Sequence, residues 1–334
     1  MIETNRRNFI RDVTALAGAM TAGASGLSNA ATIKRFSNGK PIAGVFAIGW
    51  TVCTPDDELS PPLMVEQIKF LNRGKVAGIA WPQGVSHWEN LTEKEWNDGA
   101  DALLSVKGNT AVVLGVQTVG FNPARSAEYA KAAQAKGADG IMSQCKPDAT
   151  QEELIGYFQA LASATSMPIM VQATGKVSVD QLVALSQHVP SIVAVKDEAG
   201  DPLQRAPELL TRTGGKIEDF SGHGGNSMFA EMELGFLGTC PYVGLADVQQ
   251  QVFDLYQSNR KSEAYDLFGR YLAFRSIPRA MDFVLVARGV LPESAIFRGP
   301  PAPVHLPPEP PITDAQKAQI NLALNTYMKP YLVG

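Results

Sequence analysis

The sequence has few of the residues that build metal centres and disulfide frameworks. Its 334 residues include only three cysteines and four histidines. Cys53, Cys145 and Cys240 are odd in number and far apart, and no two of them form a C-x-x-C pair. The spacing therefore predicts no metal site and specifies no disulfide, and it favours small buried thiols instead.

A strong excess of one charge is also absent. The chain has 29 Lys and Arg residues against 33 Asp and Glu residues, which gives a formal net charge of −4. Such a balance gives no reason to expect nucleic acid or an anionic membrane surface as a partner. With 45% hydrophobic and 19% charged residues, the composition is that of a globular protein large enough for one sizeable core.

The first 30 residues differ from the rest of the chain. Arg6 and Arg7 precede Asn8, Phe9 and Ile10, which is a twin-arginine pattern. A mildly apolar stretch follows, too short and too rich in glycine to span a membrane, and Ser28–Ala30 offers the small residues that a signal peptidase reads. Residues 1–30 therefore predict a twin-arginine-type signal, a periplasmic location and no membrane anchoring after processing. The alternative is an ordinary amphipathic helix in a cytoplasmic protein.

From residue 41 onward, short apolar runs alternate with helical patterns. The runs are nearly continuous rather than alternating, which is typical of parallel strands buried on both faces. The expected strands are 43–50, 76–82, 110–117, 138–144, 167–172, 191–196, 216–222 and 237–244. The expected helices are 61–74, 91–106, 126–137, 150–165, 179–188, 202–215, 226–235 and 246–259.

Eight strand–helix units predict an α/β fold, a (β/α)8 TIM barrel over residues 41–259. A doubly wound sheet is the alternative, but no G-x-G-x-x-G follows the first strand. Residues 260–334 are expected to form additional C-terminal helices packed on the barrel, with no convincing strand and with a proline-rich connector at 298–311.

Lys196 is the lysine that ends one of the expected strands. In a barrel of this kind the active site lies at the C-terminal ends of the strands. Burial among apolar groups disfavours the ammonium form, and a neutral amine can attack a ketone to form a Schiff base. The alternative is a lysine that reaches the rim and pairs with Asp197 or Glu198.

Three stretches of this sequence, at 195–201, 137–171 and 220–239, resemble the dihydrodipicolinate synthase / N-acetylneuraminate lyase family of Schiff-base lyases. VKDEAGD (195–201) resembles the Schiff-base lysine segment of that family. The stretch 137–171 resembles its fourth-to-fifth strand unit, and 220–239 resembles its seventh unit. The likeness covers roughly residues 41–295. It implies that Lys196 forms an imine with a 2-keto acid, that no metal or organic cofactor is needed, and that the protein is a dimer or tetramer.

The loop that binds the substrate carboxylate departs from the family pattern. The family has G-T-T-G-E after its second strand, where this chain has Trp81–Val85. The hydroxyl groups are missing, and Pro82 has no N–H to donate. The resemblance therefore leaves the backbone near Gln83 and Gly84 for the carboxylate.

The two tyrosines that relay protons in the family are also absent. Ser143 and Gln144 stand after the fourth strand, and Gln172 ends the fifth. A glutamine cannot exchange protons at neutral pH, but it can orient a water or a substrate hydroxyl. The string PIMVQ (168–172) resembles the branch that dehydrates 2-keto-3-deoxy sugar acids, in particular 2-keto-3-deoxy-L-arabonate dehydratase. We therefore expect a dehydratase; the alternatives are a pyruvate-dependent aldolase or synthase, and a non-catalytic exported binder of keto acids.

Acid–base candidates besides Lys196 and Gln172 are few. His223 follows the seventh strand and suits proton transfer, although such a histidine can merely pack. Lys176 is a candidate for a distal carboxylate, with a solvated loop lysine as the alternative. His87, Cys145 and Glu198 are weaker candidates, for which structural roles compete. Substrate-binding positions are also expected at Ser143, Gln144, Ser221 and Gly222.

Overall fold

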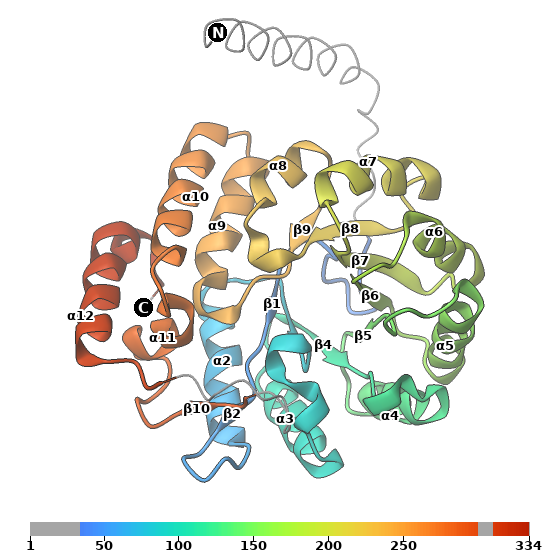
Figure 1. Cartoon of the computed structure of the whole chain (residues 1–334), viewed down its shortest axis with the longest axis horizontal. Helices are drawn as coiled ribbons and strands as arrows, with labels where there is room; N and C mark the ends of the chain where they lie inside the picture. The colour runs from blue at the N-terminus through green and yellow to red at the C-terminus, as the bar shows by residue number, and fades with distance from the viewer. Residues whose placement is uncertain (1–33, 300–309, 334) are drawn as a thin grey trace, which may run out of the picture. The chain divides into compact units, whose positions relative to one another are not determined.

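A closed barrel of eight parallel strands forms the centre of the protein (Figure 1). The computed structural model describes residues 34–299 and 310–333. The predicted signal at residues 1–30 lies outside the described residues. The barrel strands are β1 (Gly44–Ile48), β3 (Gly78–Trp81), β4 (Ala111–Gly115), β5 (Gly140–Gln144), β6 (Ile169–Thr174), β7 (Ile192–Glu198), β8 (Glu218–Ser221) and β9 (Gly238–Thr239). β9 closes the barrel on β1, where Gly44 pairs with Gly238. The predicted (β/α)8 barrel is confirmed.

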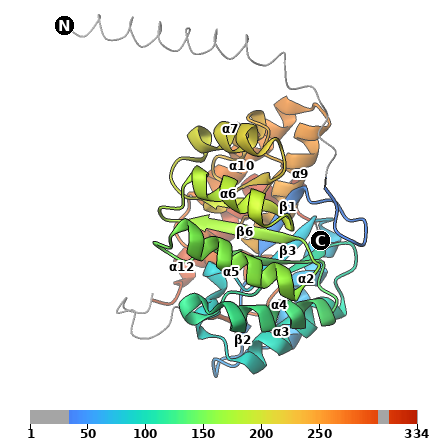
Figure 2. The same cartoon turned by 90° about the vertical axis from the view of Figure 1, so that its right-hand side faces the viewer.

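A helix follows each barrel strand and covers its outer face. These helices are α2 (Pro61–Arg73), α3 (Glu93–Ser105), α4 (Pro123–Ala135), α5 (Gln151–Ala164), α6 (Val179–His188), α7 (Pro202–Thr213), α8 (Met228–Glu233) and α9 (Ala246–Gln257). Figure 2 shows α4 to α6 along the outside of the strands. Capping boxes start several of them; Thr150 accepts a hydrogen bond from the N–H of Glu153, for example, while the Glu153 carboxylate accepts one from the N–H of Thr150.

The barrel interior has its own apolar core, which sets the depth of the site. Phe46, Met142, Met170, Ala194 and Phe220 point inward from five strands and are fully buried. Because side chains alternate along a strand, inward positions recur every second residue. The inward residues that follow this core towards the strand ends can therefore be polar and line a cavity.

Two strand boundaries differ from the sequence expectation in a way that matters for the site. β6 continues to Thr174 and β7 continues to Glu198, two residues further than predicted in each case. In β7 the charged residues Asp197 and Glu198 ended the apolar pattern, but the strand pairing with β6 continues, with Thr174 opposite Glu198. The expectation of no strand after residue 260 is wrong: β10 (Ile296–Phe297) pairs antiparallel with β2 (Val52–Cys53).

Three further helices pack beside the last barrel helices (Figure 1). α10 (Lys261–Arg275), α11 (Ala280–Ala287) and α12 (Asp314–Ala323) share one apolar cluster with α8 and α9. Arg288, directly after α11, forms a fully buried ion pair with Asp247 of α9. Within the described residues, no helix is long and apolar enough to cross a membrane.

Candidate active site

Lys196 lies inside the barrel, on the same face of β7 as Glu198. It is 5% exposed, and its Nζ lies 3.0 Å from Oε1 of Glu198. Asp197, between them, points to the outer face and pairs with Arg205 of α7 at 2.9 Å. The lysine therefore does pair with a neighbouring acid, but in the barrel interior and not at the solvent-exposed rim.

Glu198 connects three elements of the site. Its Oε2 accepts a hydrogen bond of 2.6 Å from Nε2 of Gln172 on β6, and its Oε1 accepts one of 3.2 Å from the backbone N–H of His223. Burial alone would raise the pKa of Glu198, but the Lys196 ammonium and the two hydrogen-bond donors together hold that pKa below its ordinary value. The carboxylate is thus kept ionised beside the candidate nucleophile.

The absence of a side chain at Gly222 leaves room for the side chain of Glu198. A Cβ atom on Gly222 would lie 2.1 Å from Cγ of Glu198 and 2.8 Å from the carbonyl oxygen of Asp197. The close approach of the β8 end to the β7 end therefore requires a residue without a side chain at this position. The structure brings Gly222 to the site as a spacer for Glu198.

A cavity of about 330 Å³ opens at this end of the barrel. Its lining includes both ends of the Lys196–Glu198 ion pair together with side chains from β1, the loops and α10. The lining residues are Ile48, Val85, Lys196, Glu198, His223, Gly224, Asn226, Cys240, Tyr242 and Arg275. The position of the cavity at the C-terminal strand ends is the usual one for a barrel enzyme.

The loop after β3 presents two N–H groups near the cavity. Gly84–Ser86 form one 3-10 turn, and the N–H groups of Gly84 and Val85 have no acceptor within the described residues. The N–H of Gln83, in contrast, already donates to Oγ of Ser86 at 3.0 Å. The free N–H groups of this loop are therefore those of Gly84 and Val85, and not those of Gln83 and Gly84 as the sequence led us to expect.

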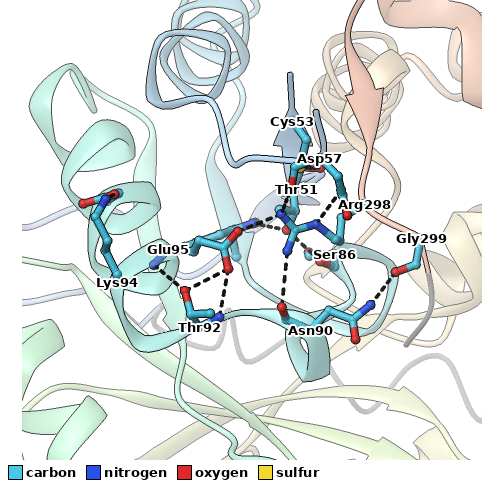
Figure 3. A network of polar contacts seen from close by, with 12 residues as sticks. Thr51, Cys53, Asp57, Ser86, Asn90, Thr92, Lys94, Glu95, Arg298 and Gly299 are labelled. Atoms are coloured by element: carbon cyan, nitrogen blue, oxygen red, sulfur yellow. Dashed lines mark hydrogen bonds and ion pairs between the residues drawn. The ribbon is translucent and has the colours of Figure 1, made fainter. Parts of the chain in front are cut away.

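A polar network from the C-terminal extension supports this loop (Figure 3). Arg298, which follows β10, donates to Oε1 of Glu95 and to the carbonyl oxygen of Asp57, each at 2.7 Å. Thr51 donates to the carbonyl oxygen of Ser86 at 2.6 Å. The network joins β10 and α3 to the loop that carries the free N–H groups.

Three predicted substrate-binding residues lie elsewhere. Ser143 points outward from β5, and its Oγ lies 2.9 Å from the hydroxyl of Tyr157 on α5. Ser221 is the register partner of the outward-facing Asp197 and shares its face of the sheet. Lys176 is 90% exposed and contacts Asp148 at 3.7 Å. Strand alternation puts both serines on the wrong face, and Lys176 is a solvated loop residue.

Of the other predicted residues, some lie at the site and some lie away from it. Gln144 is on the inner face and donates to Oγ1 of Thr174 at 3.0 Å, one strand away from Gln172. His223 and its neighbour Gly222 lie at the site. His87 is not among the cavity-lining residues, and burial lowers its pKa. Cys145 faces the helix layer, where burial raises its pKa to about 12.

Glu198 was only a weaker candidate in the sequence; it follows Lys196 by two residues and shares its face because β7 continues to Glu198. Several other cavity residues were not predicted from the sequence. Tyr242, Asn226 and Cys240 lie in segments without a distinctive motif. Arg275 comes from α10, outside the barrel, and no local pattern links it to Lys196.

The three cysteines agree with the sequence expectation of small buried thiols. All three cysteines are free and buried. In the described ranges, no group of three or more His, Cys, Asp or Glu side chains is arranged to hold a metal ion.

Comparison with known proteins assigns the family. Residues 94–265 match the model of the dihydrodipicolinate synthetase family, which is just over half of the chain. The chain belongs to this family. The match confirms the family that the resemblance in the sequence indicated.

Individual relatives carry several different names. A 4-hydroxy-tetrahydrodipicolinate synthase of Methanococcoides burtonii is 27% identical over 184 residues, 53% of this chain and 61% of the relative. A protein of Methylobacterium radiotolerans named "Probable 5-dehydro-4-deoxyglucarate dehydratase" is 29% identical over 150 residues, 43% of this chain and 47% of the relative. The chain thus spans less than two thirds of the length of both.

A solved structure shows the same fold over most of the chain. YagE of Escherichia coli K12, a member of the dihydrodipicolinic acid synthase family determined in complex with pyruvate, superposes with a TM-score of 0.71. The match covers 85% of this chain and 98% of YagE, at 18% identity.

Proposed function

We propose that this protein is a Schiff-base lyase that acts on a 2-keto acid through Lys196, and that it dehydrates a 2-keto-3-deoxy sugar acid. The observation that carries the proposal is the buried Lys196–Glu198 ion pair, bonded to Gln172, in the wall of the cavity. A buried charged pair without a chemical role is costly to keep, and a pair at a barrel's catalytic end is a functional candidate.

Glu198 supplies the proton transfers for imine formation. It takes a proton from the Lys196 ammonium, and the free amine attacks C2 of the keto acid. A proton then moves from the nitrogen to the former carbonyl oxygen, which gives a carbinolamine. The protonated Glu198 then returns its proton to the departing hydroxyl, so that water leaves and an iminium ion forms beside a carboxylate. The N–H groups of Gly84 and Val85 supply donors for the substrate carboxylate.

The same carboxylate carries the proton of the next step. The iminium ion acidifies the C3 hydrogen, and Glu198 accepts that proton as the neutral enamine forms. Loss of the nearby positive charge removes what held the pKa of Glu198 down, so its carboxyl group stays protonated until the C4 hydroxyl takes the proton. The C4 hydroxyl leaves as water with that proton, and hydrolysis of the conjugated imine releases the product and restores Lys196.

Gln172 favours dehydration over the synthase reaction. It occupies the strand position of a relay tyrosine, and its Nε2 holds Glu198 while its Oε1 is buried without a partner in the described part of the chain. That oxygen is an acceptor for a substrate hydroxyl. The relative named as a dehydratase supports this assignment. A pyruvate-dependent aldolase or synthase uses the same imine and remains the second candidate, since relatives of this family also carry the synthase name.

Borohydride reduction tests the proposal. Intact-mass analysis and peptide mapping after treatment with pyruvate or a 2-keto-3-deoxy aldonate should show one adduct, on Lys196, and none in Lys196→Ala. Products without borohydride then separate the reactions: a dehydrated acid supports the dehydratase, and pyruvate with an aldehyde supports the aldolase. Absence of an adduct with every keto acid would reject imine chemistry and favour a binding protein.

Location and assembly are proposed from the sequence and from the family. We propose export to the periplasm by residues 1–30, and a homo-oligomer in solution. Cell fractionation of the chain and of an Arg6→Lys/Arg7→Lys variant tests the first, with retention of the variant in the cytoplasm expected. Light scattering of the purified protein tests the second, and a monomeric mass would reject it.

A further inference from the structure

Arg275 is a cation in the cavity wall that no carboxylate neutralises in the described part of the chain. Its Nη1 donates to the carbonyl oxygen of Gly224 and, at 3.1 Å, to the hydroxyl of Tyr271, and its Nη2 donates to the carbonyl oxygen of His223 at 3.5 Å. All three partners are neutral. Other arginines of the extension behave differently: Arg288 pairs with Asp247 and Arg298 with Glu95.

The charges of the cavity leave Arg275 as a surplus cation. Lys196 and Glu198 neutralise each other at 3.0 Å. The keto acid must place its C2 at Lys196. Its carboxylate, which is attached to C2, then lies close by, where the N–H groups of the Gly84–Ser86 turn supply its donors. A ligand with only that carboxylate would therefore leave the guanidinium unmatched.

Arg275 is also held in place on the substrate side of the cavity. Its guanidinium carbon lies 5.7 Å from the centre of the Tyr242 ring, and Tyr242 stacks on Trp50 with ring centres 5.8 Å apart. A second hollow of about 240 Å³ begins at the same two residues, Tyr242 and Arg275. A ligand longer than pyruvate that extends from Lys196 in this direction meets a preformed donor group.

Gly224 makes this arrangement possible. A Cβ atom on Gly224 would lie 2.4 Å from Nη1 of Arg275, so only glycine lets the guanidinium rest on this carbonyl oxygen. Gly224 also has a φ of +67°, which a residue with a side chain rarely adopts. The loop after β8 is thus shaped around an arginine that comes from outside the barrel.

We propose that Arg275 forms a second anion subsite, which binds a carboxylate at the far end of the substrate. The substrate class is then a 2-keto-3-deoxy diacid and not a sugar acid with one carboxylate. This inference rests on the proposed imine chemistry at Lys196. A guanidinium is suited to the role because it presents paired donors to a planar carboxylate.

The test compares two keto acids of equal length. Apparent dissociation constants are measured from the concentration dependence of borohydride trapping with 2-oxoadipate and with 2-oxohexanoate, which share six carbons and differ in the second carboxylate. The wild type should bind the diacid at least about 30-fold more tightly, and Arg275→Met should lose most of that preference while its affinity for 2-oxohexanoate changes less than about threefold. Arg275→Lys should recover part of the preference.

Arg270 offers a matched control on the same helix. It is exposed and paired with Asp266, so Arg270→Met removes a positive charge from α10 without touching the cavity. It should leave the preference for the diacid unchanged. Equal losses for both keto acids in Arg275→Met would assign Arg275 to loop support and overturn the subsite, as would a wild type without preference. Pyruvate trapping in the wild type shows whether the imine chemistry itself works, and so it separates a failure of the subsite from a failure of the proposed function.

Discussion

Glu198 is the residue on which the proposed chemistry depends most. It is bonded to Lys196, to Gln172 and to the N–H of His223, and it is the only carboxylate among the cavity-lining residues of the described chain. The pKa of Glu198 is low while Lys196 carries a positive charge, and it rises when that charge is lost in the proposed reaction. One residue can therefore stand in for the hydroxyl relay that this chain lacks.

Replacing Glu198 by Gln should slow imine formation about 100-fold, because no group then accepts the proton of the ammonium. The pKa of Glu198 is lowered in the folded protein, so the ion pair contributes stability at pH values above the ordinary glutamate value of about 4.3 and loses it as the pH falls through the lowered value. Trapping rates and urea unfolding between pH 3 and 7 check this. Asp197→Asn, on the outer face, should keep the trapping rate; an equal loss there would argue against a direct role of Glu198.

Cys145 and Cys240 should be inert in the native protein. Burial raises the pKa of each thiol to about 12, so at pH 8 only about one molecule in 10,000 carries a thiolate. Iodoacetamide should add no mass to these residues until urea is present, as judged by intact mass and peptide mapping. Rapid labelling of Cys240 alone in the native protein would show that the cavity opens further than the structure indicates.

At the level of elements, the barrel was predictable because its signal is local and repeated. Apolar runs followed by amphipathic helices occur eight times, and each strand needs only its own residues to be recognised. The strand ends were not predictable to the residue, since Asp197 and Glu198 look like the start of a loop. Pairing with Thr174 and Ser221 on the neighbouring strands keeps them in β7.

The contact between the ends of β7 and β8 can be tested at Gly222. Gly222→Ala should displace Glu198 from Lys196, because the new methyl group would lie 2.1 Å from Cγ of Glu198. We expect a loss of about 1–3 kcal/mol in the free energy of unfolding and at least a tenfold slower trapping rate. Gly156→Ala, on α5 where nothing lies within 4 Å, should instead stabilise the protein by about 0.5–1 kcal/mol. Unchanged trapping in Gly222→Ala would show that Glu198 has room to move.

Across the whole molecule, residues far apart in sequence complete the site. Arg275 of α10 enters the cavity, and Arg298 after β10 supports the loop that follows β3. Neither could be predicted from the sequence, because each depends on how the last helices pack on the barrel. The resemblance to the family led to Lys196 and Gln172, whereas Ser143 and Ser221 face outward because side chains alternate along β5 and β8.

The Arg288–Asp247 pair tests how much the packing of the C-terminal helices on the barrel contributes to the free energy of unfolding of the whole chain. Two hydrogen bonds of 2.7 Å join α9 to the end of α11, and the side chains are 2% and 0% exposed. Arg288→Met should lower the free energy of unfolding by about 3–5 kcal/mol, because Asp247 would remain buried and unpaired, and the double variant with Asp247→Leu should lose less.

The exposed pair of Lys261 and Glu233 supplies the control for this measurement. Their side chains are 44% and 46% exposed, so Lys261→Met should cost under about 1 kcal/mol in urea unfolding. A similar small loss in Arg288→Met would mean that α11 does not stabilise the barrel through this pair. If the large loss is found and pyruvate trapping falls with it, then packing of the extension on α9 is what holds Arg275 and Arg298 in place at the site.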